Sequence, residues 1–125
     1  MSEEKIKVVM VEPGKPAYTT EIENDLKAMQ RIVGGNIEVI YWLDDALMIG
    51  NDEAKLIGME GNRRFGDQII AGTFFICGET VTNGEYDFYS LPDELCEKYS
   101  EQFSVPESIS QEEVENSIQA FVIGF

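Results

Sequence analysis

Asn62, Arg63, Arg64 and Phe65 form the group of neighbouring residues best suited to bind a ligand. The two arginines are the only adjacent basic pair in the sequence, and glycines flank the predicted loop, residues 60–66, that carries them. Guanidinium groups bind phosphate or carboxylate through paired hydrogen bonds, and an aromatic ring can stack on a base. The asparagine amide offers both a donor and an acceptor. The alternative is structural: one arginine pairs with the protein's own acids while the phenylalanine packs against the core.

Two pairs of adjacent carboxylates, Asp44-Asp45 and Asp52-Glu53, offer oxygen ligands of the kind that magnesium and calcium prefer. Neither pair has the spacing of an EF-hand loop. The carboxylate pair of a glycosidase is defined by its separation in space, so the sequence leaves such a pair open. Ordinary loop solvation also accounts for these acids. We therefore predict no metal site and no cofactor.

Catalytic motifs are absent from the sequence. The chain has no histidine, which excludes serine–histidine and cysteine–histidine nucleophiles and almost all zinc sites. It has neither a phosphate-binding loop motif nor a dinucleotide-binding glycine motif. Gly34-Gly35 follows a predicted helix, where it ends the helix instead of holding a phosphate. Cys77 and Cys96 are predicted to be reduced and buried. We predict no catalytic residues, and the sequence favours a binding protein over an enzyme.

The first half of the chain predicts strands around one helix. Lys5–Val11 is predicted to be a strand with apolar residues on both faces, and 17–22 to be a second strand. Leu26, Met29, Ile32 and Val33 then recur at helical spacing. We expect Asn24 to cap this helix.

Further strands are predicted after the glycine pair. Residues 36–42 form one, with Ile37, Val39 and Tyr41 on one face and Glu38, Ile40 and Trp42 on the other. Residues 46–49 and 56–59 are predicted to form a hairpin, and 68–77 a long strand interrupted at Gly72. Asn83-Gly84 predicts a tight turn between 77–82 and 86–89.

The last third of the chain predicts helices. Ser90 is expected to cap one of them, with Leu95, Cys96, Tyr99 and Phe103 on its apolar face. Ser110 and Glu113 have the spacing of a capping box before a second short helix or a docked tail. The sequence thus predicts a single α+β domain over residues 1–125. Its sheet is mainly antiparallel, with one well-defined helix after the first strands and one or two C-terminal helices.

The formal charge of −15, from 24 acidic against 9 basic residues, disfavours direct contact with nucleic acid or with an anionic membrane. Apolar runs are far shorter than the roughly 20 residues that span a bilayer, and a secretory signal is not recognised, so we expect a cytoplasmic protein. The charge is compatible with simple solubility. It is also compatible with an acidic surface that imitates the phosphates of DNA.

Several separated segments carry a family resemblance, and in order they are Glu21–Leu26, Gln30, Val33–Gly35, Ile37–Glu38, Gly58–Arg63, Asp67, Ile70–Phe74 and Asp87–Leu91. Together they resemble a small bacterial and phage family catalogued as domain of unknown function 3846. The resemblance extends from about residue 7 to about residue 103, and residues 104–125 form a C-terminal extension. It implies no established activity. It does imply a setting, because members occur on phages, prophages and conjugative elements, whose small proteins often counter host defence.

From this setting we expect a non-enzymatic accessory protein that sequesters a small nucleotide-derived signal, in a pocket that a homo-oligomer can complete. We expect an arginine on phosphate, Asn62 and Asp67 on ribose or base edges, and an aromatic ring for stacking. The predicted ligand-binding positions are Asn51, Asn62, Arg63, Arg64, Asp67, Thr73, Trp42 and Phe65. The net charge permits this function, because contacts inside a pocket outweigh charges screened beyond about 8 to 10 Å.

Two alternatives remain open at this point. The first is an acidic DNA mimic or protein-interaction module that inhibits a DNA-binding host protein. It requires a continuous acidic stripe, whereas the acids are spread along the chain with a mild concentration between residues 93 and 115. The second is a hydrolase that depends on carboxylates and a metal.

Overall fold

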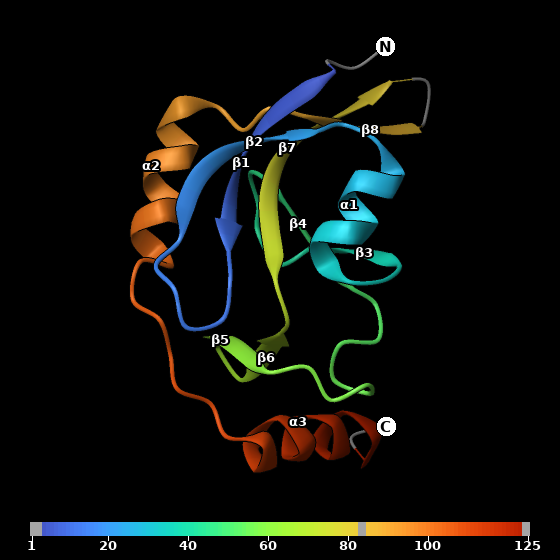
Figure 1. Cartoon of the computed structure of the whole chain (residues 1–125), viewed down its shortest axis with the longest axis vertical. Helices are drawn as coiled ribbons and strands as arrows, with labels where there is room; N and C mark the ends of the chain where they lie inside the picture. The colour runs from blue at the N-terminus through green and yellow to red at the C-terminus, as the bar shows by residue number, and fades with distance from the viewer. Residues whose placement is uncertain (1–3, 83–84, 124–125) are drawn as a thin grey trace.

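The computed structural model describes residues 4–82 and 85–123, with side chains described for residues 4–78 and 88–118. In the described residues, helix α1 follows the first two strands, six further strands come next, and two helices follow the last strand (Figure 1). The elements are β1 (Lys5–Val11), β2 (Tyr18–Glu23), α1 (Leu26–Val33), β3 (Ile37–Ile40), β4 (Leu47–Asn51), β5 (Gly61–Phe65), β6 (Gln68–Ala71), β7 (Phe74–Thr82), β8 (Glu85–Tyr89), α2 (Asp93–Gln102) and α3 (Gln111–Ile123).

The main sheet of the described residues is antiparallel, with strand order β2-β1-β7-β4-β3. β8 pairs with the second half of β7, from Gly78 to Thr82. β5 and β6 form a separate two-stranded sheet. This arrangement, with α1 after the first strands and α2 and α3 at the C-terminal end, confirms the predicted α+β fold.

Helices cover both faces of the main sheet, α1 on one side and α2 on the other (Figure 1). Alternate residues of β1 supply both cores. Ile6, Val8 and Met10 pack with α1, while Val9 and Val11 pack with α2. This alternation confirms the two apolar faces predicted for the first strand, because successive side chains of a strand point to opposite faces.

The glycine after α1 ends the helix as predicted, but its capping residue differs from the prediction. Gly34 adopts a left-handed conformation with φ 80°, and its N–H donates to the carbonyl of Gln30. At the other end, the carboxylate of Asp25, and not Asn24, accepts from the N–H of Ala28 at 2.8 Å. Asn24 instead donates its amide to the carbonyl of Phe88 and so ties the helix start to β8.

Three predictions between residues 56 and 77 are wrong. Residues 60–66 do not form a loop: residues 61–65 are strand β5, which the polar side chains concealed. Residues 56–59 form no strand but belong to a turn. Residues 68–77 are two strands in different sheets, because Gly72 turns the chain between them with φ 74°.

The predicted hairpin of β7 and β8 is confirmed by their pairing, although its turn at Asn83-Gly84 lies outside the described residues. Ser90 is not the cap of α2. Its hydroxyl accepts from the N–H of Lys7 at 2.9 Å, and the helix begins after Pro92. In the part of the chain that the structure describes, no helix has the length and apolar composition needed to cross a membrane.

Candidate functional site

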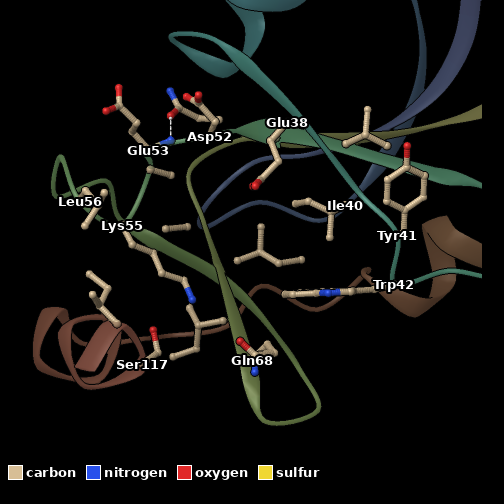
Figure 2. A pocket seen from close by; sticks show the side chains of 18 residues that line it. Glu38, Ile40, Tyr41, Trp42, Asp52, Glu53, Lys55, Leu56, Gln68 and Ser117 are labelled. Carbon is tan, nitrogen blue, oxygen red and sulfur yellow. Dashed lines mark hydrogen bonds between the residues drawn. The ribbon is translucent and has the colours of Figure 1, made fainter. Parts of the chain in front are cut away.

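A cavity of about 750 Å³ lies beside the β3 edge of the main sheet. Its walls come from β3 and the residues that follow it, the turn after β4, strand β6 and helix α3 (Figure 2). The polar and aromatic residues that line it include Glu38, Tyr41, Trp42, Asp52, Glu53, Lys55, Gln68 and Ser117. The cavity has the size of ordinary small-molecule sites, which enclose about 300 to 1,000 Å³.

Residues 38–42 of β3 and its continuation line the cavity, and alternate residues of this segment form one face. Glu38, Ile40 and Trp42 alternate along the chain and share that face, as the sequence predicts for this strand. Ile40 is half-buried against the core on the α2 side of the sheet. The face therefore offers a carboxylate, an apolar surface and an indole ring in succession.

Another predicted site residue packs against the ring of Trp42. Phe65 stacks on it, with ring centroids 5.5 Å apart and 29° between the ring planes. Phe65 in turn stacks on Phe103 of the core at 6.5 Å. Trp42 is 38 % exposed, so its ring is fixed by packing and still accessible from the cavity. Such a ring suits stacking on a planar ligand.

Glu38 and Lys55 bring opposite charges to the cavity from different walls (Figure 2). Burial raises the pKa of the Glu38 carboxyl, and the neighbouring charge of Asp52 raises it further. Burial lowers the pKa of the Lys55 ammonium, an effect that the charge of Glu38 opposes. Both groups are therefore partly desolvated, which strengthens the hydrogen bonds that they offer to a ligand.

Asn51 fixes the turn that carries Lys55. Its amide nitrogen donates to the carbonyl of Val33 at the end of α1, at 3.1 Å. Its amide oxygen accepts from the N–H of Glu53, at 2.7 Å. Asn51 is 7 % exposed and lines the cavity, but its side chain is already occupied by these two bonds. It positions the cavity wall.

The structure buries Arg63 and Asn62 away from the cavity. The Arg63 guanidinium donates to the backbone carbonyls of Lys15 (2.6 Å), Asn62 (3.1 Å) and Phe103 (2.8 Å), and to the Asn62 side chain (2.7 Å). Its Nε has no hydrogen-bond partner among the described residues, and burial lowers its pKa. The Asn62 amide donates to the carbonyls of Val11 and Gly72, each at 2.9 Å. These contacts join β5 to the end of β1, to the turn between β1 and β2, to the turn before β7 and to the end of α2.

Arg64 is exposed and paired with acids of the C-terminal segment. Its Nε and Nη2 donate to the two carboxylate oxygens of Glu113 at 2.7 Å, and its Nη1 donates to Glu107 at 3.1 Å. This pairing corresponds to the structural alternative considered for the two arginines.

The remaining predicted positions lie elsewhere. Asp67 is exposed in the turn between β5 and β6, and Thr73 is half-buried between β6 and β7; neither belongs to the cavity wall. Asp45 accepts from the Tyr99 hydroxyl and from the Lys98 ammonium. Within residues 4–82 and 85–123, no group of three or more acidic, cysteine or histidine side chains is arranged to hold a metal ion.

The structure thus brings two of the eight predicted positions, Trp42 and Asn51, to the cavity, with Phe65 supporting the first. Sequence reasoning missed Glu38, Lys55 and the α3 wall. For Glu38 a signal existed, because the predicted strand already placed it on the same face as Trp42. Lys55 had none, since its position depends on a turn that was predicted to be part of a hairpin.

The family model described as domain of unknown function (DUF3846) matches residues 6–104 of the chain. The match confirms the family that the sequence resembles. No curated protein and no solved structure matches the chain. The matched region includes the cavity walls from β3, the turn after β4 and β6, whereas Ser117 and Ile118 of α3 lie outside it.

Proposed function

This chain belongs to the family catalogued as domain of unknown function 3846, and on that premise we propose that it is a non-enzymatic protein that binds and sequesters a small nucleotide-derived ligand. The binding site is the cavity beside β3. The proposed setting is the cytoplasm of a bacterium that carries a phage or mobile element, where removal of such a signal would counter host defence.

The observation that carries this proposal is the accessible, packed ring of Trp42 in the wall of a cavity that also holds Lys55 and Glu38. Bases stack on aromatic side chains with about 1–3 kcal/mol for each base, irrespective of base identity. The ring is preorganised because Phe65 supports it. The Trp42 side chain therefore loses little conformational freedom when a ligand stacks on it.

Two of the four charged residues that line the cavity suit the rest of a nucleotide. The Lys55 ammonium is a donor for a phosphate oxygen, and the Glu38 carboxylate accepts from a base amino group or a ribose hydroxyl. Gln68 adds an amide that both donates and accepts. In the proposed binding mode, the phosphate lies near the turn after β4 and the base lies near Trp42.

Fluorescence of Trp42 offers a direct test, because it is the only tryptophan in the sequence. We expect adenosine monophosphate, cyclic AMP, ADP-ribose or a cyclic dinucleotide to change its emission and to raise the melting temperature. Calorimetry should give the same dissociation constant. If none of these ligands changes fluorescence, heat or melting temperature, the proposal fails.

Two further measurements test the proposed binding mode and the absence of catalysis. Lys55→Met should weaken binding of phosphate-bearing ligands, whereas Lys27→Met, an exposed lysine of α1, should not. Ligand recovered after denaturation should be chemically unchanged, as sequestration requires. Recovery of a product, abolished by a chelator, would instead identify a metal-dependent hydrolase.

A further inference from the structure

Helix α3 is seated on the β5–β6 hairpin, apart from the two helices that cover the main sheet (Figure 1). Val114 is fully buried there and packs with Ala54, Ile69 and Ala71 in a cluster of its own. Gly61 permits this close approach. A Cβ atom at Gly61 would lie 2.7 Å from Cγ2 of Ile109 and 3.0 Å from Cγ2 of Val114. The helix is thus fitted to the hairpin.

Polar contacts fix the start of the helix on the same hairpin. Arg64 binds both carboxylate oxygens of Glu113 and also reaches Glu107 in the segment before α3. The backbone N–H of Arg64 donates to Glu107 as well, at 3.1 Å. The hydroxyl of Ser110 accepts from the N–H of Glu113 at 3.1 Å, which is one half of the predicted capping box, while the Glu113 carboxylate binds Arg64. Two independent sets of contacts therefore define where α3 lies.

The seated helix completes the cavity. Ser117 and Ile118 follow Val114 by three and four residues, so they share its face, and both line the cavity. Figure 2 shows Ser117 in the wall that α3 forms. The Ser117 hydroxyl donates to the carbonyl of Val114 at 2.7 Å. That bond uses its single proton and leaves its oxygen available as an acceptor.

We propose that α3 determines which ligands the cavity accepts, with Ser117 and Ile118 as specificity-determining residues. This inference rests on the proposed function. The family-matched part of the chain supplies Trp42, Glu38 and Lys55, which recognise features common to nucleotides. The wall from α3 lies outside the match and limits the space on the far side of the cavity. Ligand size is therefore selected by a segment separate from the one that binds the base.

The test changes the size of the side chains in this wall and compares the binding of ligands of different size. Ser117→Leu projects extra bulk into the cavity, and Ile118→Ala removes it. Asn116→Leu is the matched control, because Asn116 is exposed and lies outside the cavity wall. Each variant is titrated with adenosine monophosphate and with ADP-ribose by Trp42 fluorescence, and urea unfolding reports whether it folds.

We expect Ser117→Leu to weaken ADP-ribose binding by about tenfold or more relative to the monophosphate, since single methylene changes in a pocket alter discrimination by about 10- to 200-fold. Ile118→Ala should shift the preference toward ADP-ribose, and Asn116→Leu should leave it unchanged. If the wild-type protein binds neither probe, the proposed function fails. If it binds them and both wall variants bind as the wild type does, this inference alone is overturned. Should Ser117→Leu not fold, Ile118→Ala still decides.

Discussion

Glu38 and Lys55 extend into one cavity from two separate walls, and the charge of each affects the ionisation of the other (Figure 2). Desolvation acts against both charges, since it raises the pKa of the carboxyl and lowers the pKa of the ammonium. A ligand that donates to the carboxylate and accepts from the ammonium would restore what both groups lose on leaving water. The pair thus connects the stability of the empty protein with its capacity to bind.

Glu38→Gln should reduce the pH dependence of stability. The raised pKa of Glu38 means that the folded protein binds more protons than the unfolded chain above pH 4.5, so its contribution to stability falls as pH rises through that window. The variant should therefore gain at neutral pH, by no more than about 0.5 kcal/mol because the side chain is exposed enough for solvent to screen it. Urea unfolding across a pH series measures this. Parallel wild-type and variant curves would contradict it.

Arg63→Met should destabilise the fold by about 3 kcal/mol or more, because it leaves the buried carbonyl of Phe103 and the part-buried carbonyl of Lys15 without their donor. Arg31→Met, at an exposed position of α1, is the control and should cost far less. Urea denaturation at fixed pH compares the two variants. If the Arg63→Met protein is stable but has lost ligand binding, Arg63 binds the ligand and its role is not structural.

Asn51→Ala should cost about 1–3 kcal/mol, the usual effect of leaving buried hydrogen-bonding groups unpaired. It should also weaken ligand binding, because the turn that carries Lys55 loses its tie to α1. Asn36→Ala removes an exposed asparagine instead and should change stability by at most about 0.5 kcal/mol. Thermal unfolding and Trp42 fluorescence titration provide the two readouts. If the Asn51→Ala protein is destabilised but its ligand affinity is unchanged, the turn that carries Lys55 does not contribute to binding.

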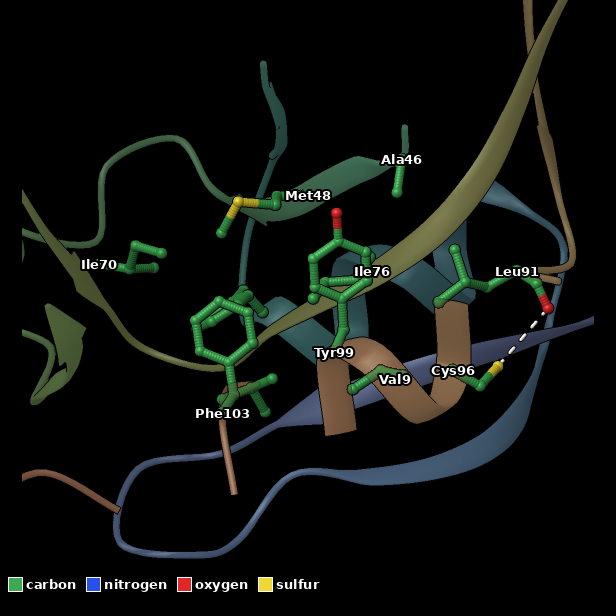
Figure 3. Close-up of a cluster of buried hydrophobic side chains, with 11 residues drawn as sticks. Val9, Ala46, Met48, Ile70, Ile76, Leu91, Cys96, Tyr99 and Phe103 are labelled. Atoms are coloured by element: carbon green, nitrogen blue, oxygen red, sulfur yellow. Dashed lines mark hydrogen bonds between the residues drawn. The ribbon is translucent and has the colours of Figure 1, made fainter. Parts of the chain in front are cut away.

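Elements with strong apolar periodicity could be predicted from the sequence. The apolar face expected for α2 is confirmed, since Cys96, Tyr99 and Phe103 are buried against the sheet (Figure 3). The faces of β1 and the glycine end of α1 are confirmed for the same reason: local pattern and burial agree. Where they disagreed, the prediction failed. Leu56 is apolar but 72 % exposed in a turn, and the polar Arg63 is buried in a strand.

The candidate site was harder to predict because long-range contacts decide it. Nothing in the sequence distinguishes the adjacent residues Arg63 and Arg64. In the fold, however, Arg63 is buried among carbonyl groups, and Arg64 pairs with acids more than forty residues away. The cavity wall from α3 likewise depends on how the helix seats on Gly61. Neither relationship leaves a local pattern, since both arise from separated segments that meet only in the folded chain.

The ion pairs of Arg64 should make the seating of α3 depend on pH. Hydrogen bonds from Arg64 lower the pKa of Glu113, so the stability that this carboxylate contributes is present above pH 4.5 and is lost as pH falls through its lowered pKa. Arg64→Ala and Glu113→Gln should therefore speed amide exchange in α3 relative to the wild type at neutral pH, and the difference should shrink in acid. Hydrogen exchange followed by mass spectrometry resolves the helix from the main sheet. Glu115→Gln, an exposed acid of the same helix, controls for the loss of one charge. Equal protection of α3 in wild type and Arg64→Ala at neutral pH would show that Val114 packing alone holds the wall in place.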